Sequence, residues 1–450
     1  MRTAPPDLPG SQTTDSPIDR ALALMLADEG EAALRWAAAV VEHDVTPSAL
    51  ILTCRLLADA GRTEAAIEGL ELAVKQATDA GNLPLAVAAV ADLRQLGRPV
   101  DGYFDEIAAS FCAGSSRLSD ISSPPPPLPN FETFQPMSSF LAGPALLSKA
   151  TNIVHGARER YQKAPELPQI ASLPLFSALE MEGLRALIAA FEMITVPSGQ
   201  AVIVEGEEGA EAYIVARGEL EVRRKPGSID DGGDVTLARL VNGSLFGEMA
   251  LLSRAPRAAS VVACRPSILL VARRDALEKV AQARPEVGIE LAAHCRRRMV
   301  ANLVRTSRVL IDVHPDARPA LVERFETNVF EKGTKLITVG EEAAGLHLIA
   351  SGEVAVIGYE SDEPLVISTL GAGEVVGEVA LVLRRKAVAD VVAVHPTVTL
   401  HLPREDFISL IKAHPAILKT LYLSAIQRDE ETSAVITNAT TSVTDDYVLV

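Results

Sequence analysis

The chain has 450 residues, which at roughly 150 residues per domain predicts about three domains. Its formal net charge of −17 argues against general binding of nucleic acid, because that requires a basic surface. Hydrophobic residues make up 48% of the chain, enough for several cores. Aromatic residues make up only 4%, so we expect these cores to consist mainly of Ala, Leu and Val.

Targeting and redox features are typical of a cytoplasmic protein. Residues 1–20 are polar and contain prolines, unlike a secretory signal. The longest apolar runs fall far short of the ~20 residues that a membrane-spanning helix needs. The four cysteines, Cys54, Cys112, Cys264 and Cys295, stand far apart and are expected as reduced thiols. We therefore expect a cytoplasmic protein without a membrane span, a metal or a cofactor.

The first third of the chain predicts a polar leader followed by helices. Residues 1–16 are rich in Pro, Ser, Thr and Asp, and we expect them to be disordered. Residues 17–118 show Ala and Leu at helical spacing, and three joints end in Gly30, Gly61 and Gly81, where a left-handed residue would end a helix. The pattern resembles tetratricopeptide-type (TPR-like) helical hairpins. Spacings of 31 and 20 residues differ from the usual value of roughly 34, so an irregular helical bundle is the alternative.

A Pro-rich linker is predicted over residues 119–144. Its run Ser122–Pro129 should form an extended spacer, because proline fixes φ and donates no backbone hydrogen bond. An SH3-type ligand is the alternative for this run. Residues 1–150 contain 10 basic and 19 acidic residues, a balance of about −9. We expect this acidic helical region to contact a protein partner.

Strand-like patterns begin at about residue 173. Short alternating segments are separated by glycines such as Gly206 and Gly218, which is typical of a small β-barrel or jelly roll. Ala350–Val354 repeats Ala216–Leu220 closely, so this part of the chain is an internal duplication with an offset of about 130–134 residues.

The predicted fold class is therefore multidomain α + β. TPR-like α-helical hairpins are followed by two β-barrel or jelly-roll domains with flanking helices. We place the first of these domains at 145–310, the second at 311–429, and a flexible tail at 430–450.

The run Phe246–Val261 is the strongest local signal. Gly247 permits close approach to the backbone, an apolar helical turn follows at 249–252, and Arg257 stands beside small residues. A guanidinium binds phosphate bidentately, and free N–H groups at a short helix start favour an anion. Glu248, nine residues before the arginine, offers a carboxylate to a sugar hydroxyl. A mutual salt bridge between Glu248 and Arg257 is the alternative explanation of the pair.

This run closely resembles the phosphate-binding cassette of the cyclic nucleotide-binding domain family, which includes regulatory subunits of cAMP-dependent protein kinase and catabolite-activator sensors. The resemblance covers about residues 173–310 and implies that Glu248 binds the ribose 2′-hydroxyl and Arg257 the cyclic phosphate. Eukaryotic members that prefer cGMP carry a threonine directly after the arginine, so Ala258 here favours cAMP. The residues implied in the ligand site are Gly247, Glu248, Met249, Ala250, Arg257, Ala258, Ala259 and Ser260.

The second copy of the cassette departs from this pattern. It keeps Gly377 and Glu378, but Ala387 stands in place of the arginine, and the neighbouring changes introduce Lys386 and Asp390. A phosphate there would lose its charge partner and face a carboxylate, so this degenerate pocket should bind cyclic nucleotide poorly or not at all. In the alternative, Lys386 or the arginine before it replaces the lost guanidinium.

Together these patterns predict a non-catalytic cyclic nucleotide sensor, since no nucleophile–base set, P-loop or metal set is found. The helix after Pro285 would pass ligand binding to the second domain, with Met299 and Leu303 as candidate contacts over the base. The basic run Arg296–Arg298 is expected to form solvated or inter-domain salt bridges. A protein-interaction scaffold with vestigial nucleotide pockets is one alternative. A transcription regulator is another, but the short stretch after Pro403 and the acidic charge argue against it.

Overall fold

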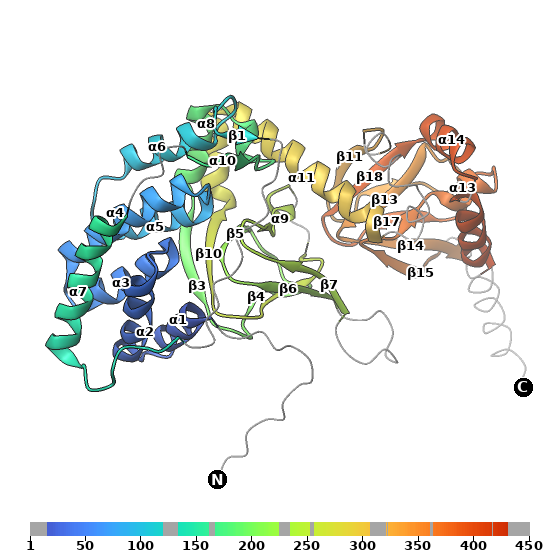
Figure 1. Cartoon of the computed structure of the whole chain (residues 1–450). Coiled ribbons are helices and arrows are strands. Elements are labelled where there is room, and N and C mark those ends of the chain that lie inside the picture. Colours follow the sequence, from blue (N-terminus) through green and yellow to red (C-terminus); the bar gives the residue numbers. More distant parts are fainter. Residues whose placement is uncertain are drawn as a thin grey trace, which may run out of the picture.

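The structure is a computed structural model that describes residues 16–119, 134–161, 167–224, 235–252, 256–306, 321, 323–360, 363–415 and 417–430. Figure 1 shows the N-terminal helices beside a first β-sandwich, with a second sandwich beyond the long helix α11 (Pro285–Thr306). The run Ser122–Pro129 and nearly all of the expected leader and tail lie outside the described residues.

The described chain before the linker contains six helices, and each packs against the next. Gly61 and Gly81 have φ angles of +78° and +77°, as the pattern of joints predicts. At the first joint the prediction is wrong: Asp28 takes the left-handed conformation with φ of +63°, and Gly30 begins the next helix. Asp tolerates this conformation because its short side chain bonds locally. The helices are α1 (Pro17–Leu26), α2 (Gly30–His43), α3 (Pro47–Asp59), α4 (Thr63–Asp79), α5 (Leu83–Gln95) and α6 (Asp101–Phe111).

The segment after the linker returns to these helices. α7 (Gly143–Arg160) packs against α2, α3 and α4. Arg160 donates to the carbonyl oxygen of Glu42 at 2.6 Å, which ties the end of α7 to α2. The short strands β1 (Leu118–Ser119) and β2 (Ile170–Ala171) form a parallel pair. The start of the segment that we assigned to the first sandwich domain therefore packs on the helical region.

The first sandwich consists of two four-stranded sheets, with strand orders β3-β10-β5-β8 and β4-β9-β6-β7. The two sheets stay separate and do not close into a barrel. Of the two architectures that the sequence predicts, the structure therefore has the jelly roll. Along the central strand β5, alternation directs Ile214 toward the helices and Tyr213 between the sheets. The elements are η1 (Phe176–Ala178), α8 (Met181–Ala189), β3 (Glu192–Val196), β4 (Ala201–Ile203), β5 (Glu211–Arg217), β6 (Leu220–Arg224), β7 (Val235–Leu240), β8 (Leu245–Phe246), α9 (Met249–Leu252), β9 (Ser260–Ala263), β10 (Ser267–Arg273) and α10 (Arg274–Ala283).

The second sandwich repeats the first, with strand orders β11-β18-β13-β16 and β12-β17-β14-β15. Its strands take the same places in the same chain order, so the duplication predicted from the sequence is a repeated topology. The elements are β11 (Glu326–Phe330), β12 (Lys335–Ile337), β13 (Gly345–Ser351), β14 (Glu353–Glu360), β15 (Glu363–Gly371), β16 (Val375–Val376), α13 (Glu378–Val382), β17 (Asp390–Ala393), β18 (Thr397–Pro403) and α14 (Arg404–Ala413), and residues 417–430 form a further helix.

The N-terminal helices share one continuous core with a sheet of the first sandwich, whose second core lies between its two sheets. α5 packs against β3, β5 and β10, and one hydrophobic cluster contains Leu93 of α5 with Ile214 and Leu270 of the sheet. Asp19, in the first turn of α1, is only 1% exposed and pairs with Arg217 of β5 at 2.5 Å. The helices therefore cover an apolar sheet face that would otherwise meet water.

Helix α11 packs into both sandwiches. Cys295 and Arg298 contact the cassette of the first. Met299 and Leu303 are buried in the core of the second, in one cluster with Phe325. The two side chains that we considered as contacts over a bound base thus lie in the second domain's core.

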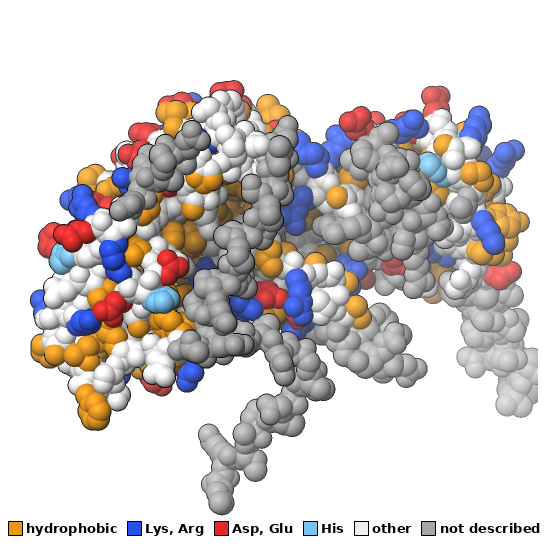
Figure 2. Space-filling view, viewed as in Figure 1, with side chains coloured by type: hydrophobic (Ala, Val, Ile, Leu, Met, Phe, Trp, Pro, Cys, Tyr) orange, Lys and Arg blue, Asp and Glu red, His pale blue; other side chains and the backbone are white. Residues whose placement is uncertain are grey.

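The basic run on α11 is used within the fold. Arg296 donates to the carbonyl oxygen of Phe325, and Arg297 pairs with Glu290 at 2.5 Å. Figure 2 shows basic and acidic side chains interspersed over one face of the molecule. Within the described ranges, no helix combines the length and the apolar character needed to cross a bilayer.

Candidate functional site

The first cassette begins at Gly247, whose left-handed backbone conformation favours glycine. Gly247 follows β8 directly, has a φ of +72°, and leads into α9. A Cβ at this position would lie 3.0 Å from the carbonyl oxygen of Glu211 and 3.2 Å from Nη1 of Arg257. Both the backbone conformation and the space therefore require glycine here.

The guanidinium of Arg257 is nearly enclosed, with its side chain 8% exposed. Nη1 donates to the carbonyl oxygen of Gly247 at 2.9 Å, and Nη2 donates to that of Glu211 at 3.0 Å. The Glu211 carboxylate lies 3.4 Å from Nη2. Burial lowers the pKa of Arg257, while nearby Tyr213 and Glu211 act to raise it. A Cβ at Gly209 would overlap this guanidinium, so that glycine makes room for the arginine.

Glu248 is buried, with 3% of the residue exposed, and its Oε1 lies 3.2 Å from Nε of Arg298 on α11. Cys295, one turn earlier on α11, approaches the Glu248 carbonyl oxygen with its Sγ at 3.7 Å. Burial raises the pKa of Glu248, and Arg298 opposes this shift. Glu248 and Arg257 thus have separate partners, Arg298 and Glu211, instead of the mutual salt bridge considered above.

The remaining predicted residues follow in the same segment. Ala250 is buried within α9, and Ala258 accepts a bond from Arg224 through its carbonyl oxygen at 3.1 Å. The hydroxyl of Ser260 accepts a bond from the N–H of Glu205 at 2.9 Å. The predicted set thus lies along the segment from the end of β8 to the first residue of β9: Gly247, Glu248, Met249, Ala250, Arg257, Ala258, Ala259 and Ser260.

Two neighbours of the site were not predicted from the sequence. Glu211 lies far from the cassette in the chain, and only the fold brings it to Arg257. Arg298 is separated from Glu248 by 50 residues, but the internal repeat contains a signal for it. Arg428 lies 130 residues after Arg298, which is the distance between Glu248 and Glu378.

The second cassette reproduces this glutamate–arginine arrangement. Gly377 has a φ of +92°, and Glu378 is 1% exposed. Nη1 of Arg428 lies 2.5 Å from Oε1 of Glu378 and also donates to the carbonyl oxygen of Val375 at 2.5 Å. Burial raises the pKa of Glu378, and Arg428 opposes the shift.

The phosphate half of the second cassette is different. Ala387 occupies the arginine position and lines a cavity, which neither Arg385 nor Lys386 lines. Arg385 instead pairs with Asp429. Of the two side chains considered as replacements for the guanidinium, Arg385 is thus engaged elsewhere and Lys386 does not line the cavity.

Asp390 is also placed differently from our expectation. We expected its carboxylate to face a phosphate, but it does not line the cavity. Its Oδ2 lies 2.6 Å from Nζ of Lys335, and its Oδ1 accepts a bond from the N–H of Val339 at 2.7 Å. Tyr359 donates to the same carboxylate. Lys335 and Tyr359 hold the pKa of Asp390 below its usual value, although its burial acts in the opposite direction.

Comparison with known proteins identifies these repeats. Residues 193–284 and 327–414 each match the cyclic nucleotide-binding domain. The chain carries two such domains in tandem. The N-terminal helices lie outside both matched ranges, so their TPR-like character stays a prediction.

Regulatory subunits of cAMP-dependent protein kinase are among its homologues. A cAMP-dependent protein kinase regulatory subunit of Yarrowia lipolytica is 32% identical over 207 residues, which cover 46% of this chain and 50% of that protein. The type II regulatory subunit of Drosophila melanogaster is 27% identical over 239 residues, covering 53% of this chain and 59% of that protein. The chain spans about half the length of the curated relatives it matches. The solved regulatory domain of Toxoplasma gondii PKA with cAMP is 24% identical, with a TM-score of 0.29, and covers 55% of this chain and 90% of that one.

Proposed function

We propose that this protein is a non-catalytic sensor that binds a cAMP-like cyclic nucleotide in its first cyclic nucleotide-binding domain. The observation that carries the proposal is the enclosed guanidinium of Arg257 beside the left-handed Gly247. An arginine in this setting offers a fixed, charge-assisted fork to one small anion. The cyclic phosphate would replace the weak contact to Glu211, whose carboxylate lies 3.4 Å away.

Glu248 is proposed to accept a bond from the ribose 2′-hydroxyl. Its carboxylate is held by Arg298 through Oε1 at 3.2 Å, so its orientation is fixed before a ligand arrives. Preorganisation of this kind lowers the entropy cost of binding. Ala258, where a cGMP-preferring domain would carry threonine, supports cAMP as the preferred nucleotide.

Transmission to the second domain is proposed to begin at α9. Within this short helix, Met249 packs against the core of the second domain, and Leu251 packs against the core shared with the N-terminal helices. A ligand that moves α9 therefore disturbs the packing of both cores. The pair Glu248–Arg298 adds a polar contact between the cassette and α11. Coupling follows if the two arrangements of α9 differ in ligand affinity.

The output of the sensor is proposed to be a protein partner that contacts the acidic helical region. A scaffold role with vestigial nucleotide pockets is a second candidate, and the loss of the arginine at Ala387 favours it for the second domain. The proposed cytoplasmic location follows from the sequence features described above.

Isothermal titration calorimetry with cAMP and cGMP tests the first proposal. We expect one cAMP site per chain in the wild type, weaker binding of cGMP, and a loss of cAMP affinity of at least a hundredfold for Arg257→Ala, because a charge-assisted bidentate contact is lost. Arg257→Lys should recover only part of the affinity, since an ammonium has no fork. Arg273→Ala, which removes a largely exposed arginine of the same domain, is the matched control. Absence of binding heat from both nucleotides at millimolar concentration would contradict the sensor proposal and favour the scaffold role. Unchanged binding in Arg257→Ala would show that the nucleotide binds at another site.

A further inference from the structure

Strand β15 (Glu363–Gly371) lies at an edge of the second sandwich. It stands last in the sheet β12-β17-β14-β15, and among the described residues its only neighbouring strand is β14. The N–H and C=O groups on its other side therefore have no ladder partner among the described strands, and such groups can pair with a further strand. The edge of β15 is thus a candidate surface for an extended segment.

The outer face of this edge exposes apolar surface. Val366 is 58% exposed and lies opposite Ile357 of β14, which is itself only partly buried. Two features that usually discourage pairing at an edge are present, namely Pro364 and a register shift beside Ile367. They flank Val366 without covering it, so a further strand at this edge would remove apolar surface from water.

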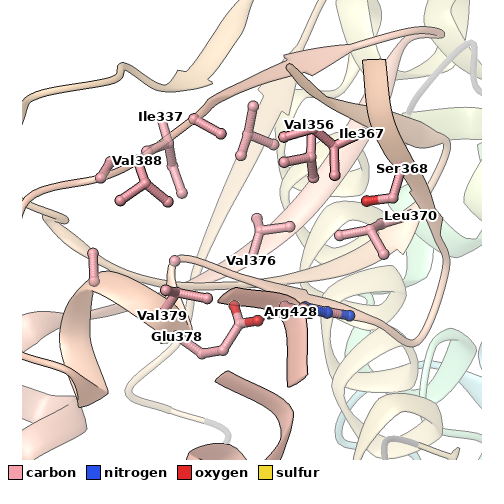
Figure 3. Close-up of a pocket in the computed structure, with 15 residues that line it drawn as sticks. Ile337, Val356, Ile367, Ser368, Leu370, Val376, Glu378, Val379, Val388 and Arg428 are labelled. Carbon is pink, nitrogen blue, oxygen red and sulfur yellow. Dashed lines mark hydrogen bonds and ion pairs between the residues drawn. The ribbon is translucent and has the colours of Figure 1, made fainter. Parts of the chain in front are cut away.

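The helix of residues 417–430 ends beside β15. Nη2 of Arg428 lies 3.4 Å from Oε1 of Glu374. Oε2 of Glu374 in turn accepts a bond at 2.8 Å from the N–H of Gly371, the last residue of β15. Figure 3 shows Arg428 on the same side of the cavity as Ser368 of β15. The chain that follows this helix therefore starts close to one end of β15.

The sequence beyond this helix, which lies outside the described residues, contains a segment suited to a strand. Residues 447–450 read Tyr-Val-Leu-Val, of which the tyrosine and the valines are types favoured in strands. At about 3.3 Å per residue, residues 431–446 can span roughly 50 Å, whereas the 9 residues of β15 extend for roughly 30 Å. The segment can therefore reach any part of the edge.

Strand β7, at the matching edge of the first sandwich, is the alternative place for this segment. It also exposes apolar side chains, since Val235 is 52% and Leu237 is 43% exposed. Figure 1 shows the helix of residues 417–430 at the side of the second sandwich that faces away from β7. Closing a long loop costs more entropy than closing a short one, so the edge of β15 is favoured.

We propose that residues 447–450 add to the edge of β15 of the same chain as a further strand, with one of their side chains packed on Val366. Main-chain hydrogen bonds along the edge would provide the affinity, and the alternation of side chains would set the register. The segment would fasten the helix of residues 417–430 to the sheet and would cover an edge that could otherwise pair with a second copy. The inference does not depend on the proposed function, and it departs from the expected flexible tail only for this segment.

Hydrogen exchange of the full chain, read by mass spectrometry, tests the proposal. The amides of β15 that do not bond to β14 should exchange about tenfold or more slowly in the full chain than in a chain shortened to residues 1–446. Amides of β7, the matched edge of the first sandwich, should exchange at the same rate in both chains. Equal exchange of β15 in the two chains overturns the proposal, as does a loss of protection in β7 instead of β15.

Proline variants test the pairing without shortening the chain. Alternate N–H groups of a strand face its neighbour, so at least one of Val448→Pro and Leu449→Pro should speed the exchange of β15 about tenfold. Thr437→Pro, in the residues before the segment, is the matched control and should leave the exchange within about twofold. No effect of either proline contradicts the assignment. Protection of β15 that disappears when the full chain is diluted would show pairing between copies and would overturn pairing within one chain.

Discussion

At the residue scale, the difference between the two pockets is a matter of one methyl group as much as of one charge. Gly209 lies in a backbone conformation open to any residue, and what it provides is space for Arg257. In the second domain, Ala343 and Ala387 stand in the places of Gly209 and Arg257. A methyl group in the place of Gly209 would overlap a guanidinium in the place of Arg257, so the two alanines fit together and an arginine beside Ala343 would not. Pairs of this kind link the choice of ligand to side-chain volume.

We therefore predict that Gly209→Ala lowers the affinity for cAMP by about tenfold to a hundredfold, the range expected for loss of a charged hydrogen bond. The added Cβ displaces the end of a flexible side chain, so the domain should still fold. Calorimetric titration measures the affinity, and circular dichroism checks the fold. Gly371→Ala, at a glycine with nothing near its Cβ position, is the matched control. Full affinity in Gly209→Ala would show that Arg257 does not need its present position.

At the scale of elements, the decisive pieces are α9 and α11. Neither has a strong pattern of its own, because α9 is only four residues long and α11 changes partners along its length. Residues of α11 that follow each other in sequence contact different domains: Arg298 the first cassette, and Met299 the second core. We therefore expect a movement of the cassette to be passed to the second domain through α11.

We predict that Met249→Ala uncouples the domains without destroying the ligand site. Its side chain packs against the second core and contributes no charged group to the pocket. Affinity for cAMP should stay within about threefold, while the cAMP-induced rise in the melting temperature of the second domain should fall by at least half. Differential scanning calorimetry gives both transitions. Ile289→Ala, an exposed apolar position on α11, should behave like wild type, and unchanged coupling in Met249→Ala would direct attention to Arg298 instead.

The fold class and the candidate first site could be predicted from local patterns, because strand alternation, glycine turns and the cassette are short-range signals, and the ligand role of that site stays a prediction. The packing of α5 on β3, β5 and β10 could not, since apolar Ala and Leu positions do not specify which surface they cover. The same limit applies to Glu211, which reaches Arg257 only through the antiparallel order of the sheet. Asp390 was misjudged because its partners, Lys335 and Tyr359, come from two other strands.

At the scale of the whole molecule, the N-terminal helices share a core with one sheet of the first sandwich, and the second sandwich has a core of its own. The second sandwich also contains a histidine pair where the first has Tyr213 and Val271: His347 stacks on His401 at 4.5 Å between ring centroids. His347 is 6% exposed.

This arrangement predicts that acid weakens the second sandwich. Burial and the neighbouring His401 lower the pKa of His347 to about 4, below its usual 6.5. The unfolded chain therefore binds the proton more tightly, and the stability contributed by neutral His347 is complete above pH 6.5 and is lost as the pH falls toward 4. The loss is of order 3 kcal/mol at most. The groups facing His347 are Thr399, whose hydroxyl lies 3.1 Å from Nδ1, Phe330 and His401, and Glu326 lies 3.5 Å from His401.

Calorimetric melting between pH 7 and pH 4 measures this effect on the second transition. His347→Tyr, which installs the residue of the first domain, should remove most of the pH dependence. His294→Gln is a useful comparison, because burial and Arg298 also lower the pKa of His294 to about 4, but on α11. If the acid-induced fall in the second melting temperature persists in His347→Tyr and disappears in His294→Gln, the acid sensitivity belongs to His294 on α11 and the prediction for His347 is wrong.

Because α11 packs into both sandwiches, it can connect the binding of two ligands. If one ligand alters the position of Arg298 and another alters the packing of Met299, their binding equilibria are linked through this one helix. Linkage is reciprocal: if the first ligand changes the affinity for the second by some factor, the second changes the affinity for the first by the same factor. A molecule that occupies the second pocket would then set the concentration of cyclic nucleotide to which the first responds.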